Sequence, residues 1–316
     1  MIREKDGVHF ELDRCYVADS KTSVGDVNLV SHAHFDHLHR GNGEVICSDE
    51  TFRLAEARTG DDIQRTEDHD VELIPSGHII GSRASLFGGE ERYLYTGDVS
   101  LRDRAYIEGF SPPDADILVV ESTYGIPAYR LPEQEELEKR ILDWMEDAEG
   151  PLFLFGYSLG KAQKIQYLVQ QNTERRIVAH GAVKKMNDAV EEATDLSFRA
   201  EPYDSDVELG RDSVFIGPPK AARQDWVDER VERTGGSKAG FSGWAVHSDD
   251  SDRFDRYFPF SDHCGFDDLV ELVRTVDPDR VYTMHGFDEA FASHLSREFG
   301  YSARPLKKNQ SSLEDF

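Results

Sequence analysis

The sequence predicts a mixed α/β (α+β) protein in which a strand-rich domain is interrupted by an inserted domain of alternating strands and helices. Short apolar runs fill residues 8–120, and most of them end in a histidine or a carboxylate. Residues 131–252 instead alternate apolar runs with amphipathic segments, a pattern typical of a parallel sheet. Residues 253–316 resemble the first part of the chain again, with an apolar run that ends in a histidine. We therefore expect one domain in two parts, 1–130 and 253–316, with the inserted α/β domain at 131–252.

In the first part of the chain, β-prone apolar runs predict strands, and the cap signal at Ser48 predicts a short helix. The run from Ile117 to Val120 is apolar without interruption, so it predicts a central strand buried on both faces. The predicted strands lie at 8–12, 15–19, 27–31, 71–75, 83–87, 92–96 and 117–120, and the helix lies at 51–58.

Helical periodicity opens the inserted domain, where apolar residues at i, i+4 and i+8 predict a helix at 133–147. The last part of the chain predicts a helix from Phe266, a strand at 281–284 and a final helix through Leu295. Within the inserted domain, strands that are each followed by a helical segment are predicted at 152–155, 176–179 and 214–216.

The chain carries a formal net charge of −26 from 62 acidic and 36 basic residues, and only 11 of the basic residues are lysine. An acidic surface with few lysines resembles that of halophilic proteins; the alternative is an ordinary acidic cytosolic protein. Proteins that bind nucleic acid normally present a basic surface. If the partner is a nucleic acid, metal ions or high salt have to offset the repulsion.

Cys15, Cys47 and Cys264 are widely spaced and form no C-x-x-C pair, which argues against a disulfide framework and favours a reducing compartment. The N-terminus lacks the apolar core of a signal peptide. No apolar run approaches the ~20 residues of a membrane span. We expect a cytoplasmic protein with no membrane partner.

The stretch H-A-H-F-D-H at 32–37 places three histidines and one aspartate directly after a predicted strand. Neutral imidazole and carboxylate are the ligands of a borderline-soft divalent ion such as zinc. In extended chain His32 and His34 project to one side, whereas Asp36 and His37, past the bend, can reach a second point. Two metal positions are indicated. The alternative is a His-rich surface turn, which only further ligands would exclude.

Further polar residues follow other predicted strands at the point where each strand ends. Layered α/β folds commonly build sites from residues at strand ends. Two of them have an ordinary alternative when taken alone: His78 as a satisfied loop histidine and Glu121 as a surface or capping acid. The strand-end residues are Asp19, His78, Asp98, Glu121, His263 and His285.

The order and context of these residues resemble the metallo-β-lactamase superfamily. Its successive motifs match Asp19, the stretch 32–37, His78, Asp98 and His285. The resemblance implies a four-layer αββα sandwich.

Other motifs are similar to the β-CASP nucleases of that superfamily, namely E-S-T-Y-G from Glu121, S-D-H ending at His263 and M-H-G at 284–286. F-G-Y-S-L-G-K-A-Q at 155–163 and S-G-W at 242–244 resemble more closely the DNA-ligase-associated exonucleases, also described as mRNA 3′-end processing factor-like. The resemblance spans nearly the whole chain. It implies an inserted β-CASP domain, single-stranded DNA or RNA as substrate, and a DNA ligase or helicase as partner.

The resemblance also implies two zinc ions (Zn²⁺), with Mn²⁺ as the alternative, and Asp98 bridging them. Two ions ~3.5–4 Å apart can share a hydroxide, lower the pKa of water toward ~7 and neutralise charge that develops on a phosphodiester. The implied ligands are His32, His34 and His78 for one ion and Asp36, His37 and His285 for the other.

His263 is expected to protonate the leaving oxygen or to bind the phosphate, and Glu121 to orient it, because a carboxylate partner favours the charged imidazolium. Asp98 is counted among the catalytic residues as the bridging ligand. The family role of Asp19 is to support the histidine loop without binding metal.

Four residues of the inserted domain are candidates for substrate binding: Lys161, Ser158, Ser242 and Gly243. Lys161 at the start of a helix could bind a backbone phosphate; the alternative is a solvated lysine in a helix opened by glycine. Tyr157 and Trp244 could stack on a base, although core packing is favoured for both.

The sequence therefore predicts a zinc-dependent nuclease that cleaves single-stranded nucleic acid, in DNA repair or in RNA 3′-end processing. The rival enzyme is a small-molecule thioester or lactone hydrolase of the same fold, favoured by the acidic surface. A catalytically inert paralogue that only binds nucleic acid is the third alternative, and the filled ligand positions disfavour it. RNA and DNA are not separated by any motif.

Overall fold

The computed structural model describes residues 1–316 except 23, 40–42, 61–63, 249, 251 and 307–316. The chain divides into two compact units. Unit 1 comprises Met1–Arg102, Glu108–Pro127 and His263–Phe316, and unit 2 comprises Asp103–Ile107 and Ala128–Asp262. Sequence patterns placed the second boundary after residue 252, whereas the division in the structure falls after Asp262, because strand β16 pairs with β15 of unit 2.

Two sheets of unit 1 face each other across an apolar core. The strand orders are β1-β2-β3-β4 and β18-β17-β10-β9-β8-β7. The bounds are β1 Ile2–Lys5, β2 Gly7–Glu11, β3 Cys15–Ala18, β4 Val27–Leu29, β7 Val71–Pro75, β8 Arg83–Gly88, β9 Arg92–Tyr95, β10 Ile117–Glu121, β17 Arg280–Met284 and β18 Ala303–Pro305. A separate pair is formed by β5 Glu44–Val45 and β6 Gln64–Arg65.

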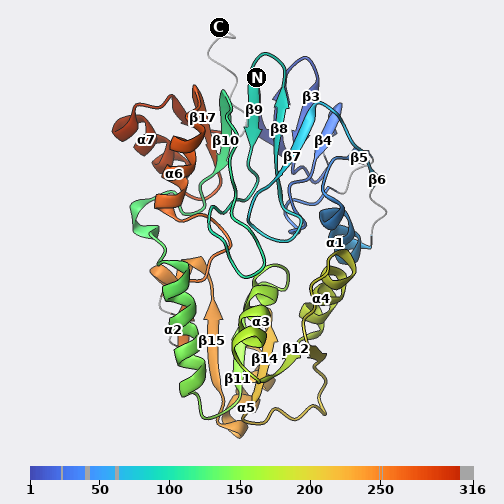
Figure 1. The fold of residues 1–316 in the computed structure, drawn as a ribbon, viewed down its shortest axis with the longest axis vertical. Coiled ribbons are helices and arrows are strands. Elements are labelled where there is room, and N and C mark those ends of the chain that lie inside the picture. Colours follow the sequence, from blue (N-terminus) through green and yellow to red (C-terminus); the bar gives the residue numbers. More distant parts are fainter. Residues whose placement is uncertain (23, 40–42, 61–63, 249, 251, 307–316) are drawn as a thin grey trace. The chain divides into compact units, whose positions relative to one another are not determined.

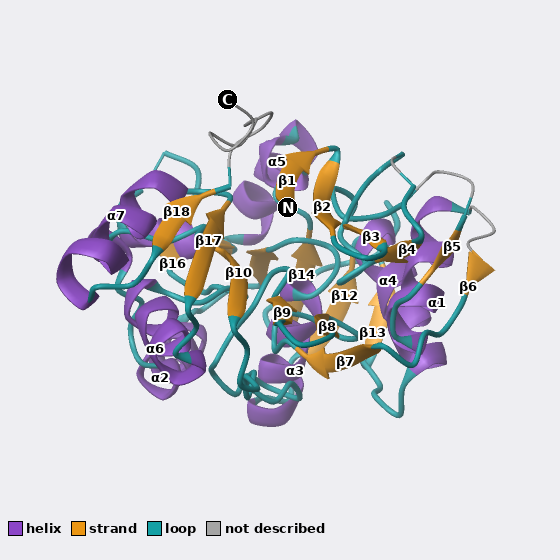
Figure 2. Cartoon of the chain, turned by 90° about the horizontal axis from the view of Figure 1, so that it is seen from above, coloured by secondary structure: helices purple, strands orange, loops and turns teal. Residues whose placement is uncertain are grey.

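Strand β10 accounts for the layering of unit 1. Ile117 and Val119 belong to the core between the two sheets, and Leu118 and Val120 belong to a second core. The predicted burial of this strand on both faces is thereby confirmed. The second core is closed by helices α6 (Phe266–Val276) and α7 (Asp288–Phe299), and Figure 2 shows α7 beside β17 and β18. Helix α1 (Asp49–Thr59) begins at the predicted Ser48 cap, whose side chain accepts the Thr51 N–H.

Unit 2 contains one six-stranded sheet of order β13-β12-β14-β11-β15-β16, in which every paired strand is parallel. Leu152 and Leu154 face a core shared with α2 and α3, and Phe153 and Phe155 face a core shared with α5, so helices cover both faces (Figure 1). The strands are β11 Leu152–Phe155, β12 Arg176–Ala179, β13 Ala200–Pro202, β14 Ser213–Gly217, β15 Ser237–Phe241 and β16 Arg256–Phe258. The helices are α2 Gln134–Asp147, α3 Lys161–Asn172, α4 Gly181–Ala193 and α5 Asp225–Thr234, with 3₁₀ turns η1 Pro127–Tyr129, η2 Ala221–Arg223 and η3 Gly243–Val246.

The mixed α/β class is confirmed, with parallel and antiparallel strands in unit 1 and a parallel sheet in unit 2. Among the described helices, none has both the length and the apolar character that crossing a bilayer requires.

Candidate metal and catalytic site

Asp19 fixes the start of the histidine loop. It directly follows strand β3, whose parallel neighbour β4 leads into the loop, and its backbone is left-handed with φ +50°. Its Oδ1 accepts the backbone N–H of Ser31 at 2.7 Å, and its Oδ2 accepts the Ser31 hydroxyl at 2.6 Å. This geometry supports the predicted role of Asp19 as a residue that holds the loop.

His37 is oriented by the same carboxylate. Its Nδ1 lies 2.8 Å from Asp19 Oδ2, which also accepts the hydroxyl of Tyr95 at 2.7 Å. With Nδ1 engaged, Nε2 faces Asp98 Oδ2 at 3.7 Å. Burial acts to lower the pKa of His37, but Asp98 and Asp19 outweigh it and raise that pKa to about 10. A metal ion bound here competes with this proton.

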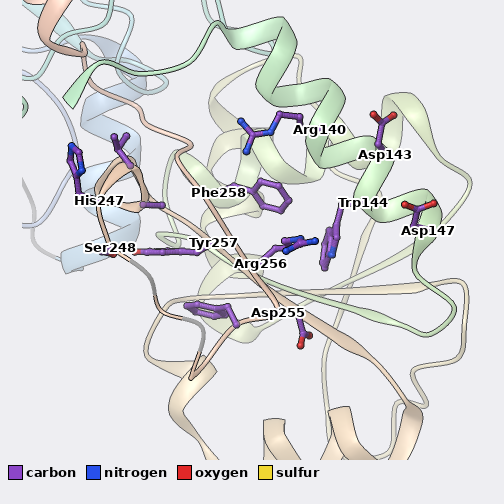
Figure 3. Close-up of a pocket in the computed structure, with 13 residues that line it drawn as sticks. Arg140, Asp143, Trp144, Asp147, His247, Ser248, Asp255, Arg256, Tyr257 and Phe258 are labelled. Carbon is purple, nitrogen blue, oxygen red and sulfur yellow. The ribbon is translucent and has the colours of Figure 1, made fainter. Parts of the chain in front are cut away.

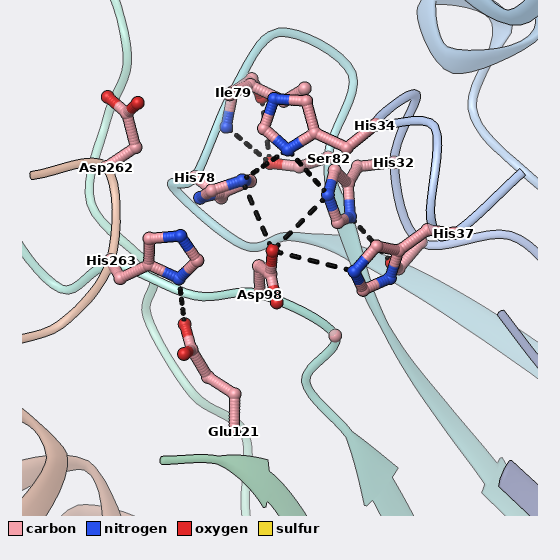
Figure 4. A network of polar contacts seen from close by, with 12 residues as sticks. His32, His34, His37, His78, Ile79, Ser82, Asp98, Glu121, Asp262 and His263 are labelled. Atoms are coloured by element: carbon pink, nitrogen blue, oxygen red, sulfur yellow. Dashed lines mark hydrogen bonds and ion pairs between the residues drawn. The ribbon is translucent and has the colours of Figure 1, made fainter. Parts of the chain in front are cut away.

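Three imidazole nitrogens and one carboxylate oxygen converge at the first predicted metal position (Figure 4). His34 Nδ1 lies 3.0 Å from His32 Nε2 and 3.2 Å from His78 Nε2. Asp98 Oδ2 lies 3.4 Å from His32 Nε2 and 3.5 Å from His78 Nε2. Tetrahedral zinc ligands about 2.1 Å from the ion lie about 3.4 Å from one another, so these four atoms fit one zinc ion.

Burial sets the electrostatics of these ligands. Burial and the neighbouring imidazoles lower the pKa of His32 well below its usual value, so the ring is neutral, which is the form that binds a metal. Burial raises the pKa of Asp98, although His37 and His263 act in the opposite direction. A divalent ion would compensate the buried Asp98 carboxylate, since an uncompensated buried charge is strongly unfavourable.

The second predicted ligand set is more open. His37 Nε2 lies 3.8 Å from Asp36 Oδ2, and the Asp36 side chain is 76% exposed. His285 follows β17 with φ +61°, and its ring centroid lies 6.1 Å from that of His37. A pocket of about 230 Å³ is lined by these three ligands together with Lys5, so the set is open to a ligand.

Glu121 and His263 form a hydrogen-bonded pair in which Glu121 is buried and His263 is half-buried. Glu121 Oε1 lies 2.8 Å from His263 Nδ1 and accepts the Val99 N–H at 3.0 Å, and the Thr123 hydroxyl donates to Oε2. Burial acts to raise the pKa of Glu121, but His263 outweighs it and holds that pKa below its usual value. The N–H of Cys264 donates to the Val99 carbonyl at 2.8 Å. Glu121, Val99 and Cys264 thus form a connected set of hydrogen bonds that fixes the His263 imidazole.

Neither of the two substrate-binding candidates at the start of α3 is exposed to solvent. Ser158 is half-buried, and Lys161 is only 3% exposed. The Lys161 ammonium lies 3.2 Å from Asp262 Oδ2. The alternative of a solvated lysine is therefore wrong, because Lys161 forms a buried ion pair. A role for Lys161 in binding phosphate stays a prediction, and it would have to compete with Asp262.

The second predicted turn carries Ser242 and Gly243. Ser242 caps η3 by accepting the Trp244 N–H at 3.3 Å, and Gly243 is buried. Core packing was favoured for Tyr157 and Trp244, and it is wrong for both, because they are 59% and 39% exposed. Base stacking stays a prediction for these two rings.

Three supporting residues of unit 1 carry no motif that the sequence could reveal. Ser31 and Tyr95 hold the Asp19 carboxylate, and Val99 joins Glu121 to Cys264 through its backbone. The available signal is position, since Ser31 and Val99 directly neighbour His32 and Asp98 in the chain.

A second pocket, of about 940 Å³, lies wholly in unit 2. Arg140 and Arg256 line it together with Trp144, and so do Asp143 and Asp147 (Figure 3). None of the predicted substrate-binding residues lines it. Because basic and acidic side chains alternate, its charge does not select one class of ligand.

Comparison with known proteins gives a consistent family assignment. Residues 256–305 match the family model described as the Zn-dependent metallo-hydrolase RNA specificity domain. A protein named Probable DNA ligase from Opitutus terrae is 33% identical over 87% of this chain and 28% of its own length. Probable RNase MJ4 from Methanocaldococcus jannaschii is 24% identical over 75% of this chain and 67% of its own length.

The fold is shared with a solved structure, that of a protein of unknown function from Enterococcus faecalis. The TM-score is 0.63 with 16% sequence identity, over 90% of this chain and 80% of that one. The chain spans only 28% of the DNA-ligase-named relative, so the activity of that whole protein does not transfer directly.

Proposed function

The chain belongs to the β-CASP branch of the metallo-β-lactamase superfamily, and on this premise we propose that it is a metal-dependent phosphodiesterase that cleaves single-stranded nucleic acid. One observation carries the proposal: Asp98 Oδ2 lies 3.4, 3.5 and 3.7 Å from ring nitrogens of His32, His78 and His37. A carboxylate between two groups of imidazoles is the arrangement that a two-metal hydrolytic site requires.

Two zinc ions are the proposed cofactors, with Mn²⁺ as the alternative. When bound, such a pair of ions lowers the pKa of the attacking water and neutralises charge on the phosphate. Asp98 would be a ligand to both ions and would hold them close together. The remaining ligands are His32, His34 and His78 for the first ion and Asp36, His37 and His285 for the second.

His263 is the proposed proton donor to the leaving oxygen. Glu121 remains a carboxylate, so it accepts the Nδ1–H of His263, and Nε2 is the nitrogen proposed to face the substrate. The same carboxylate stabilises the imidazolium, the form that donates a proton. Asp19 performs the corresponding task for His37 by holding Nδ1 and directing Nε2 to Asp98.

The names of the relatives favour nucleic acid as the substrate. One is named a DNA ligase and the other an RNase, so DNA repair and RNA 3′-end processing are both proposed settings. These names favour a phosphodiesterase over a thioester or lactone hydrolase. The pairing of buried Glu121 with the half-buried His263 favours a catalyst over an inert binding protein.

The test of this function is the Asp98→Ala variant, assayed on labelled single-stranded RNA and DNA at high potassium concentration. The wild type should cleave at least one strand and contain two metal ions per chain. Asp98→Ala should lose cleavage because the shared ligand is gone, and its metal content should fall by elemental analysis.

Asp70→Ala is the matched control, since it removes one carboxylate from an exposed surface cluster of the same unit. It should keep both cleavage and metal. Undiminished cleavage by Asp98→Ala, or wild-type turnover of a thioester panel at rates equal to those on the strands, would refute the proposed function.

A further inference from the structure

Unit 2 buries a cluster of charged side chains that the proposed chemistry does not use. Asp262 is 2% exposed, Lys164 is 0% exposed and Lys161 is 3% exposed. Lys164 Nζ lies 2.8 Å from Asp262 Oδ1, and Lys161 Nζ lies 3.2 Å from Oδ2. Each carboxylate oxygen therefore has its own ammonium, and both ammonium groups come from helix α3. The orientation of the Asp262 carboxylate is fixed by a rigid element.

A contribution to folding stability does not by itself explain why this cluster of buried charges is present. Replacing a buried ion pair by apolar residues of similar volume is often neutral or stabilising. Burial lowers the pKa of Lys164 to about 8, although Asp262 acts in the opposite direction. For Asp262 the two lysines outweigh burial and hold its pKa far below the usual range. Because burial disfavours the charged forms of these side chains, their presence indicates that they fix local geometry.

Asp262 directly precedes His263 in the chain, so fixing Asp262 also restrains the backbone at His263. The His263 ring is held by Glu121, and the residue after it is held through the Cys264 N–H on the Val99 carbonyl. The residue before it is held by the two lysines of α3. His263 is thus restrained through its side chain and through both chain neighbours.

We propose that Lys164 and Asp262 are positioning residues for His263, with Lys161 securing the second oxygen of the carboxylate. The ion pair fixes the chain directly before His263 and so sets the direction in which its Nε2 meets the leaving oxygen. This inference rests on the proposed function, in which His263 donates that proton. It assigns these buried charges to orientation of the proton donor and not to binding of phosphate.

Lys164→Met is the decisive variant. It should fold, because methionine has a similar length and Lys161 still pairs with Asp262. On an ordinary single strand, kcat should fall on the order of 10²-fold, the usual contribution of general acid catalysis, while KM changes by less than about threefold. On a p-nitrophenyl phosphodiester, whose leaving group needs no proton, the loss should nearly vanish.

A double-mutant cycle separates positioning from an independent role. In the His263→Ala background, Lys164→Met should cause little further loss, because the group that it positions is absent. Losses that multiply in the double variant, or an equal loss on the p-nitrophenyl ester, would overturn the proposal.

Lys238→Met is the matched control. Lys238 is 7% exposed and pairs with Asp228 at 2.6 Å in the same unit, but neither residue adjoins a predicted site residue. This variant should show a comparable change in thermal midpoint and unchanged kcat.

A measurement that does not depend on catalysis distinguishes the positioning role from the proposed function. In ¹⁵N-histidine-labelled protein, the Nδ1–H signal of His263 on Glu121 should shift in Lys164→Met and stay unchanged in Lys238→Met. A wild type that cleaves no strand would defeat the proposed function alone. An unchanged His263 signal in Lys164→Met would defeat the positioning role alone.

Discussion

At the scale of single residues, the site depends on carboxylates that orient imidazoles. Asp19 contacts Nδ1 of His37, and Glu121 contacts Nδ1 of His263, so Nε2 of each ring is the nitrogen that the proposed chemistry uses. Both acids also accept a backbone N–H, Asp19 that of Ser31 and Glu121 that of Val99. A buried carboxylate that accepts several hydrogen bonds is a rigid support for the ring that it holds.

Asp19→Asn tests this support. The amide keeps the shape of the side chain but loses the charge that favours its bonds to His37 and Ser31. Zinc affinity should fall by about 10–100-fold, the usual effect of removing a partner that orients a ligand, as measured by competition with a chromogenic chelator. Asp26→Asn is the control, since Asp26 accepts the Cys15 N–H at 2.8 Å at an exposed site of the same sheet. Equal affinities in both variants would contradict the role of Asp19.

At the scale of elements, apolar patterning predicted those strands whose residues face a core on both sides, such as β10 and β11. Strands β13, β15 and β16 were missed because Ala200–Pro202 and Arg256–Phe258 are short and Ser237–Phe241 contains serine, lysine and glycine. Candidate ligands were found because each follows a strand or lies in a dense motif. The burial of Lys161 in an ion pair could not be predicted, since its partner Asp262 is distant in sequence.

Helix α6 carries a prediction at this scale. Asp268 Oδ2 accepts the Gly265 N–H at 3.0 Å, and the same carboxylate pairs with Arg102 at 3.0 Å. Asp268→Ala removes both contacts from a buried position, so the free energy of unfolding should fall by about 1–3 kcal/mol in urea denaturation. Glu271→Ala, at an exposed position of the same helix, should stay within about 0.5 kcal/mol of the wild type. A similar effect of both substitutions would mean that the cap contributes nothing specific.

At the scale of the whole molecule, the net charge of −26 predicts that stability depends on salt. Repulsion among surface carboxylates opposes the compact state, and salt screens it, since the Debye length falls from about 10 Å at 0.1 M to about 3 Å at 1 M. The thermal midpoint should therefore rise as KCl increases over that range. The variant Glu229→Lys/Glu232→Lys changes two exposed acids of α5 into bases and should be more stable than the wild type at low salt, with a smaller gain on adding KCl. Equal salt dependence in the two proteins would show that repulsion at this surface does not limit stability, and the acidic composition would then need an explanation in solubility alone.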